Sequence, residues 1–180
     1  MTLPSTTLVL DACTTITFAR VKRLDIVAGI PGIRVVIAAR ALAEVKKQPA
    51  KDMIAKAIRN NLIAVASISL EDPAEAAALA TYDGDHRFRE TGEAEVLALA
   101  VARRYVGGSD EHIVREAAEA ALGKGYALQT VNLMKIAVVD GRLTVDEAVS
   151  VFESMDVAPT YMRALARLGM GTPRDFFNLR

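Results

Sequence analysis

Four carboxylic acids in this 180-residue chain have positions from which they could act together. Three come at or just after apolar segments that we predict to be strands, and one lies at the start of a helix; they are Asp11, Glu44, Asp110 and Glu95. Carboxylates gathered at one edge of a sheet repel one another unless a cation neutralises them. Hard oxygen ligands suit Mg²⁺ or Mn²⁺, so the pattern predicts a metal site for phosphoryl chemistry.

The helix start at 91–100, TGEAEVLALA, contains two acids, Glu93 and Glu95. Residues two apart on a helix point about 200° away from each other, so the two side chains cannot face one point. Glu95 shares an apolar stripe, and we expect it to face inward toward a cation. Glu93 is nearer the helix N-terminus, where the helix dipole favours an anion. Glu95→Gln is therefore expected to cost more activity than Glu93→Gln.

Each acid also has a structural interpretation when it is taken alone. Asp11 and Asp110 suit the N-cap position of a following helix. Glu44 lies among basic residues and suits a surface ion pair. The two histidines, His86 and His112, are isolated in the sequence, and we expect surface or loop positions for both. Only the combination of the four acids favours a metal site.

The acids are positioned by short buried strands that alternate with helices. Predicted strands cover 6–11, 33–38 and 62–68, and a weaker candidate covers 105–109, where two glycines disfavour a strand. Predicted helices cover 14–29, 39–48, 50–61, 72–82, 93–105, 112–123, 144–155 and 159–180, and 126–141 begins as a strand and continues as a helix. This alternation predicts an α/β/α sandwich with a mainly parallel sheet, whose sites lie beyond the carboxyl ends of the strands.

The composition fits one domain over 1–180, with 159–180 a C-terminal helix and tail. Hydrophobic residues make up 52% of the chain, enough for a substantial core. The 22 basic and 22 acidic side chains balance, so a strongly basic nucleic-acid binder is not indicated, although a local patch is compatible. We expect the single cysteine, Cys13, to be a small buried hydrophobe. No apolar run could span a bilayer and no signal peptide is evident, so we expect a soluble cytoplasmic protein without a membrane partner.

Four segments occur in the order LVLDACTTITFAR, RALAEVKK, TGEAEVLALA and SDEHIVREAA. Their order and context resemble a PIN-domain nuclease of a subgroup related to VapC-type toxins, and GEAEVLALA is the most specific piece. The trailing TVNLMKIAVVDGRLTVDEAVSVFESM is similar to the C-terminal helices of that subgroup. The resemblance implies an α/β/α sandwich with a Mg²⁺- or Mn²⁺-dependent acidic site that cleaves RNA by metal-activated water. It also implies an antitoxin protein as partner and a homodimer.

Carried over by position, the resemblance makes Asp11, Glu95 and Asp110 metal ligands. Glu44 would hold a second metal ion or orient the attacking water, and Glu93 would be a secondary ligand or a helix cap. The small polar residue that often follows the first acid in this family is matched by Thr14 or Thr15.

Two positions depart from the family pattern. Gly107 and Gly108 precede Asp110 where an aliphatic strand is usual, which predicts a looser segment there. Asn132 stands where the family has a small glycine turn.

Basic residues close to the acids in the sequence could hold the RNA backbone, and Phe88 could stack on a base. These residues are Arg40, Lys46, Lys47, Arg87 and Arg89. For any one of them, a solvated surface charge is the alternative.

Two other functions remain open on the sequence. One is a catalytically impaired PIN-like module that binds RNA or a protein. The other is a phosphatase of the haloacid-dehalogenase type, since DACTT has the Asp and Thr of a D-x-D-x-T pattern. Cys13 replaces the second Asp, which that chemistry uses as acid and base, so the phosphatase is disfavoured.

Overall fold

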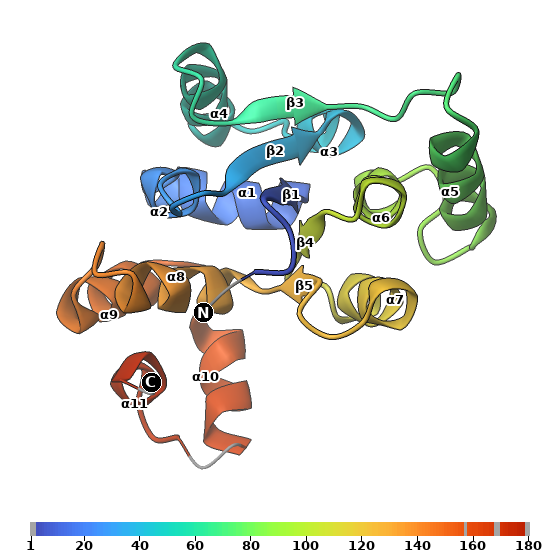
Figure 1. The fold of residues 1–180 in the computed structure, drawn as a ribbon. Coiled ribbons are helices and arrows are strands. Elements are labelled where there is room, and N and C mark those ends of the chain that lie inside the picture. The colour runs from blue at the N-terminus through green and yellow to red at the C-terminus, as the bar shows by residue number, and fades with distance from the viewer. Residues whose placement is uncertain (1–2, 157, 168–169, 179–180) are drawn as a thin grey trace.

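The computed structural model describes residues 3–156, 158–167 and 170–178 (Figure 1). Within these residues five strands form one parallel sheet in the order β3-β2-β1-β4-β5. The strands are β1 (Thr7–Leu10), β2 (Arg34–Ala38), β3 (Ala64–Ala66), β4 (Val106–Gly108) and β5 (Ala127–Leu128). The predicted α/β/α sandwich is confirmed.

Helices cover both faces of the sheet. In Figure 1, α1, α2, α4 and α8 lie on one side, α6 and α7 lie on the other, and α5 packs outside α6. The helices are α1 (Ala12–Arg20), α2 (Asp25–Ala28), α3 (Ala39–Glu44), α4 (Ala50–Arg59), α5 (Pro73–Gly84), α6 (Gly92–Arg103), α7 (His112–Leu122), α8 (Thr130–Val139), α9 (Val145–Glu153), α10 (Ala158–Arg167) and α11 (Pro173–Asn178). None of these described helices is both long and apolar enough to cross a bilayer.

The central strands are apolar along their whole length because helices cover both of their faces. Leu8, Val9 and Leu10 of β1 are fully buried. The glycine-rich segment 106–108 forms a strand despite its low propensity, since β1 and β5 pair with it on both sides. Gly108 lies opposite Leu10, and a Cβ atom at Gly108 would lie 2.6 Å from Leu10 Cδ2. The glycine therefore makes room for a core leucine.

The chain changes direction within the sheet between β1 and β4. From β1 it continues to β2 and β3 on one side, and it then returns to β4 and β5 on the other side. Open α/β sheets bind ligands at such a switch point, beyond the carboxyl ends of the strands. Asp11 follows β1, and its amide donates to the carbonyl of Gly108 over 3.1 Å. Asp110 follows β4 by two residues, so both acids come from this point.

Several predicted boundaries differ from the observed ones. The predicted helix 14–29 is two helices, α1 and α2, because the chain turns at Lys22, whose φ is 58°. The predicted helix 39–48 ends at Glu44, after which Val45 is extended. The C-terminal segment 159–180 holds two helices, α10 and α11, and residues 168–169 and 179–180 of it lie outside the described residues.

Candidate functional site

Asp11 lies at the switch point with an unsatisfied carboxylate. It is the N-cap of α1 and is 2% exposed. Its Oδ1 accepts a hydrogen bond from the Thr14 amide over 2.7 Å. Its Oδ2 is buried and has no hydrogen-bond partner among the described residues, and the same holds for the buried hydroxyl Oγ1 of Thr14. Two neighbouring buried oxygen atoms are thus without partners at the place where a ligand is expected.

The environment of Asp11 opposes its negative charge. Burial raises the pKa of Asp11 to about 7, and the negative charge of Asp110 adds to this. The Ser109 hydroxyl and the amide and hydroxyl of Thr14, which lie close to the carboxylate, offset only part of the rise. A buried anion with a free oxygen is stabilised by a cation, so the donor set at Asp11 fits a metal ion.

Asp110 is held by α8 and by α10. Its Oδ1 accepts hydrogen bonds from the Thr130 amide, over 2.8 Å, and from the Tyr161 hydroxyl. Its Oδ2 accepts from the Thr130 hydroxyl over 2.7 Å. Since a carboxylate has about four acceptor positions, one position remains on Oδ2.

Asp110 therefore caps the start of α8, and the expectation that it caps the helix directly after it is wrong. Glu111 occupies the N-cap position of α7 without a side-chain cap bond. The Ser109 hydroxyl oxygen accepts from the Glu111 amide over 3.1 Å. Ser109 thus supports the turn into α7, while the carboxylate of Asp110 is directed to a different helix.

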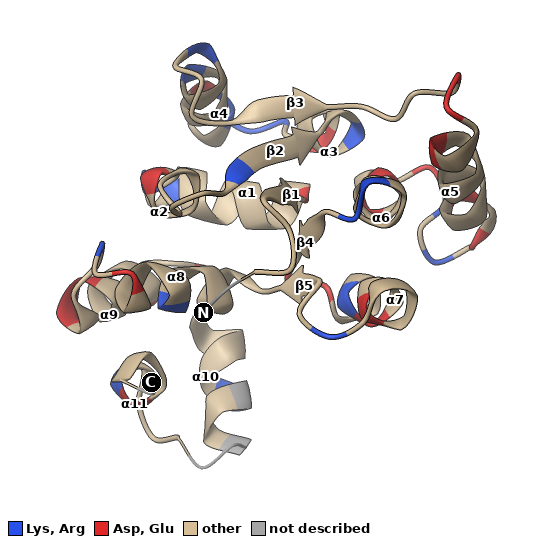
Figure 2. Ribbon diagram, viewed as in Figure 1, with Lys and Arg blue, Asp and Glu red and all other residues tan. Residues whose placement is uncertain are grey.

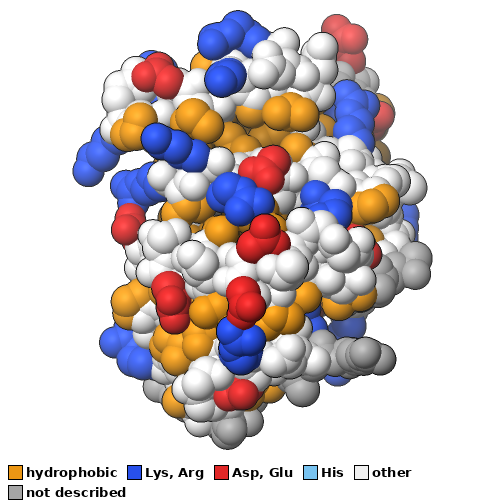
Figure 3. Space-filling model, turned by 90° about the vertical axis from the view of Figure 1, so that its left-hand side faces the viewer, with side chains coloured by type: hydrophobic (Ala, Val, Ile, Leu, Met, Phe, Trp, Pro, Cys, Tyr) orange, Lys and Arg blue, Asp and Glu red, His pale blue; other side chains and the backbone are white. Residues whose placement is uncertain are grey.

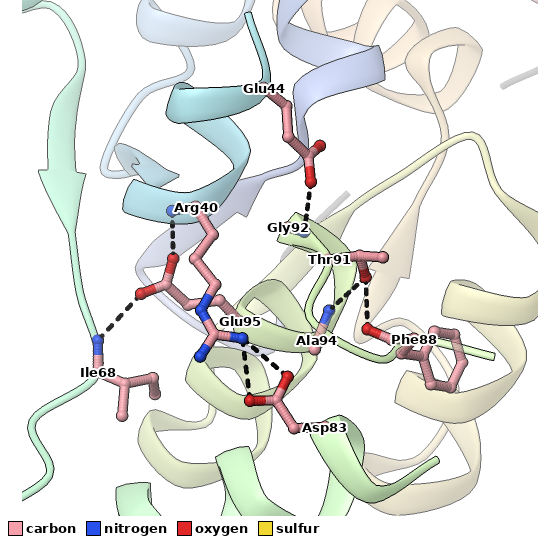
Figure 4. Close-up of polar contacts among 9 residues, drawn as sticks. All are labelled: Arg40, Glu44, Ile68, Asp83, Phe88, Thr91, Gly92, Ala94 and Glu95. Atoms are coloured by element: carbon pink, nitrogen blue, oxygen red, sulfur yellow. Dashed lines mark hydrogen bonds and ion pairs between the residues drawn. The ribbon is translucent and has the colours of Figure 1, made fainter. Parts of the chain in front are cut away.

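Glu44 and Glu95 form a reciprocal clamp between α3 and α6 (Figure 4). Glu95, on α6, accepts from the Arg40 amide at the start of α3, over 2.6 Å, and from the Ile68 amide, over 3.3 Å. Glu44, at the end of α3, accepts from the Gly92 amide at the start of α6, over 2.6 Å. Each helix thus supplies a carboxylate that accepts a hydrogen bond from a backbone amide in the first turn of the other helix, where amides have no partner within their own helix.

Gly92 allows the two helices to come this close. A Cβ atom at Gly92 would lie 2.7 Å from Ala41 Cα and 2.9 Å from Ala41 N, and both are backbone atoms of α3. Thr91 caps α6, its Oγ1 accepting from the Ala94 amide over 3.4 Å. The Gly-Glu-x-Glu sequence therefore has a packing role in its glycine and a capping role in Glu95.

The partner of Glu95 differs from the one that we predicted. Its side chain is buried, as expected, but its two oxygens accept backbone amides and do not meet Asp11 and Asp110 at a metal. Within residues 3–156, 158–167 and 170–178, no three acids, histidines or cysteines are arranged to hold one ion. The 200° separation on the helix correctly predicted that Glu95 faces inward. It could not predict that two backbone amides from distant segments would bind its carboxylate.

Glu93 is the other acid of the Gly-Glu-x-Glu sequence, and its charge acts on Cys13 in the first turn of α1. It is half-buried, and no hydrogen bond to its carboxylate is found in the described part of the chain. Burial of the Cys13 sulfur and the charges of Asp11, Glu111, Asp110 and Glu93 together raise the pKa of the Cys13 thiol to about 11. The charges of these four residues are therefore close enough to be felt in the first turn of α1.

Cys13 itself is exposed as a residue, so the prediction of a buried hydrophobe is wrong. It lies on the solvent side of the first turn of α1, whereas Thr14 and Thr15 face the core. With its raised pKa, the thiol stays protonated at neutral pH and is a poor nucleophile or base there.

The basic residues near the site differ in their partners. Arg40 donates to Asp83 over 2.7 Å, and Arg87 donates to Asp85 over the same distance. Phe88, which we expected to stack on a base, is 1% exposed and belongs to a core cluster under α6 and α7. It anchors the loop that follows α5 and is out of reach of a base.

Lys46, Lys47 and Arg89 are exposed. The two lysines lie in the connection from α3 to α4, which is partly blue, the colour of Lys and Arg, in Figure 2. By contrast, the face over α2, α4 and α9 mixes both signs of charge with apolar patches (Figure 3). His86 and His112 are largely exposed, as predicted.

Two residues that contact Asp110 were not predicted from the sequence. Thr130 begins α8 and binds Asp110 with both its amide and its hydroxyl. Tyr161 reaches Asp110 from α10, 51 residues further along the chain. A threonine at a helix start is a usable signal, but nothing local marks the tyrosine.

No protein-family model, curated protein or solved structure matches this chain.

Proposed function

We propose that the chain is a metal-dependent endoribonuclease that cleaves RNA phosphodiester bonds with a metal-activated water. The observation that carries this proposal is the buried oxygen of Asp11 at the switch point of the sheet, which has no partner in the described part of the chain. Mg²⁺ is commonly held by only one or two carboxylates together with waters and substrate phosphates. A site without three converging side chains is therefore compatible with this chemistry.

In this proposal, three acids bind the cation and a threonine contacts water or phosphate. Asp11 would hold the cation through Oδ2, and Glu93 and the remaining acceptor position of Asp110 would hold it directly or through water. Thr14 offers its hydroxyl to a water or a phosphate oxygen beside Asp11. A cation bound there supplies an activated water and stabilises charge on the phosphate and the leaving oxygen.

Glu44 contributes from the neighbouring helix. Its Oε1 is bonded to the Gly92 amide, and no described donor is bonded to Oε2, so that oxygen can orient the attacking water. Lys46 and Lys47, just after Glu44, supply positive charge for the RNA backbone.

The resemblance to VapC-type toxins also suggests a role in the cell and a partner protein. On that reading the protein is a toxin of a toxin–antitoxin pair, with a small antitoxin protein as partner and a homodimer as its working form. A gene for a small DNA-binding protein beside the gene for this chain would support this part.

A second candidate is a PIN-like module that binds RNA or a protein without cleaving it. The observation in its favour is that Glu44, Glu95 and Asp110 accept hydrogen bonds from backbone amides in the first turns of helices and so act as helix caps. Three of the four predicted acids thus have a structural role that requires no metal.

The test is incubation of the purified protein with labelled single-stranded RNA in Mg²⁺, Mn²⁺ or EDTA. Cleavage that requires the metal and falls by about a hundredfold or more in Asp11→Asn is the expected result. Asn retains the N-cap role of Asp11, so the variant keeps α1 intact. Binding without cleavage in either metal would overturn the nuclease and leave the binding module.

A further inference from the structure

A pocket of about 330 Å³ opens between α1 and the connection from α3 to α4. Part of its wall is apolar and consists of Ile16, Val45, Pro49 and Ala50. Gln48 adds an amide group, which can both donate and accept hydrogen bonds. The volume lies at the lower end of the range of roughly 300–1,000 Å³ that is typical of ligand pockets. Apolar walls with one amide suit a flat heterocyclic base.

The other part of the lining is cationic. Arg20, Lys46 and Lys47 contribute to the pocket. Arg20 pairs with Asp156, but both side chains are largely exposed, and such pairs exchange easily for a phosphate. The two lysines are exposed and form no ion pair within the described residues. Three cations around a base-sized hollow suit the phosphates on either side of a nucleoside.

The pocket adjoins the acidic site through Glu44. This residue lines the pocket, and its carboxylate holds the first amide of α6, one residue before Glu93. On the opposite wall, α1 starts directly after its N-cap, Asp11, and carries Ile16 and Arg20 into the pocket. Both walls therefore lead directly from the acids to the cations.

We propose that this pocket holds one nucleotide of single-stranded RNA, next to the phosphate that lies over Asp11. The inference rests on the proposed nuclease function and names where that function grips its substrate. The base enters between Ile16 and Val45, and Lys46 and Lys47 bind the phosphates that flank it. A double-stranded substrate, whose bases are stacked and paired, cannot fill the pocket in this way.

The first experiment measures binding of a short dye-labelled single-stranded RNA by the full chain in EDTA, so that no cleavage occurs. Lys46→Ala/Lys47→Ala is compared with Arg34→Ala/Lys124→Ala, which removes the same charge at the opposite edge of the sheet, where both residues are exposed. We expect the pocket variant to bind about tenfold more weakly than the control variant. The slope of log affinity against log salt should fall by about 1.4, as for two lost phosphate contacts on a single strand. Equal effects in the two variants would overturn the proposal.

The second experiment separates base insertion from simple phosphate binding. Methyl NMR signals of Ile16 and Val45 are followed while adenosine or uridine 5′-monophosphate is added, and inorganic phosphate is the comparison. Shifts with the nucleotides and not with phosphate are expected; signals that stay unmoved by nucleotides would overturn base insertion. RNA binding through the pocket without cleavage would sink the nuclease and leave the pocket assignment standing. Metal-dependent cleavage that is unchanged in Lys46→Ala/Lys47→Ala would support the nuclease and overturn the pocket assignment.

Discussion

Two acidic regions at the same edge of the sheet differ in how their carboxylates are satisfied. In the clamp between α3 and α6, Glu44 and Glu95 accept backbone amides at short distances. At the switch point between β1 and β4, Asp11 uses one oxygen as a helix cap, and its other oxygen is buried without a partner in residues 3–156, 158–167 and 170–178. Among the described residues, the clamp has no buried oxygen without a partner, whereas the switch point has Asp11 Oδ2.

The difference teaches which acids to associate with function. A buried carboxylate that accepts helix amides is stabilised by the fold and can be explained by packing alone. A buried carboxylate with a free oxygen and a raised pKa is unfavourable for stability, and such groups cluster at functional sites. Of the acids that the sequence placed together, Asp11 is the one with a buried oxygen that has no partner among the described residues.

The strongest test of the clamp is Glu95→Gln, which replaces one accepting oxygen with an NH₂ group that faces a backbone donor. We expect a loss of about 3 kcal/mol in the free energy of unfolding, measured by urea titration in EDTA. Glu93→Gln, two residues away, should change it by no more than about 0.5 kcal/mol. The cleavage assay at low temperature should then show the larger loss at Glu93. That order is the opposite of the one expected from helix geometry alone. A larger loss of cleavage at Glu95 would support Glu95 as the metal ligand, as first predicted from the sequence.

The switch point should behave in the opposite sense, because Asp11→Asn removes an unfavourable charge. Its pKa of about 7 in the folded protein lies above its ordinary value of 3.8. The folded protein therefore keeps a proton that the unfolded chain releases, and its stability falls as the pH rises between these two values.

Urea unfolding in EDTA at about pH 5 and about pH 8 measures this effect. The wild-type protein should lose on the order of 2–3 kcal/mol between the two, relative to Asp11→Asn. Parallel pH profiles for the two proteins would show that Asp11 is not strained by its burial. Added Mn²⁺ should recover part of the loss in the wild type only.

The close approach of α3 and α6 can be broken at Gly92. A Cβ atom there would press on the backbone of Ala41, so Gly92→Ala should cost about 1–3 kcal/mol of stability. Gly84→Ala is the matched control, since a Cβ atom at that helical position would meet nothing within 4 Å. Thermal unfolding of the two variants measures the difference, and a neutral Gly92→Ala would mean that the helices separate without penalty.

The smallest expected effect concerns the arginines of the loop after α5, one of which has an ion-pair partner and one of which has none among the described residues. Arg87 is paired with Asp85, whereas Arg89 is exposed and has no ion pair among the described residues. Arg89→Ala should lower the salt slope of RNA binding by about 0.7, and Arg87→Ala should lower it less. Fluorescence anisotropy over a range of salt concentrations distinguishes the two, and the reverse order would show that the Asp85 pair opens to the RNA.

The sequence predicted the class of fold and the candidate acids because both follow from short-range patterns. Apolar runs of strand length alternate with helical segments, and acids stand at the ends of these runs. Helix caps within one segment, such as Asp72 for α5 and the capping box of Thr144 with Glu147, were also predictable. The strand at 106–108 was harder to predict, because its stability comes from pairing with β1 and β5.

The sequence by itself determined that a parallel α/β sheet brings several acids to one edge, since side-chain periodicity and strand polarity are local properties. Only the tertiary structure decided what each acid touches. Glu95 meets an amide 55 residues away, and Asp110 meets Tyr161 from a helix near the end of the chain. Such contacts depend on how helices dock, and a helix terminus offers amide donors to any carboxylate that docking brings near. Among the described residues, no donor meets Asp11 Oδ2, and Oδ1 caps only the helix that Asp11 itself precedes.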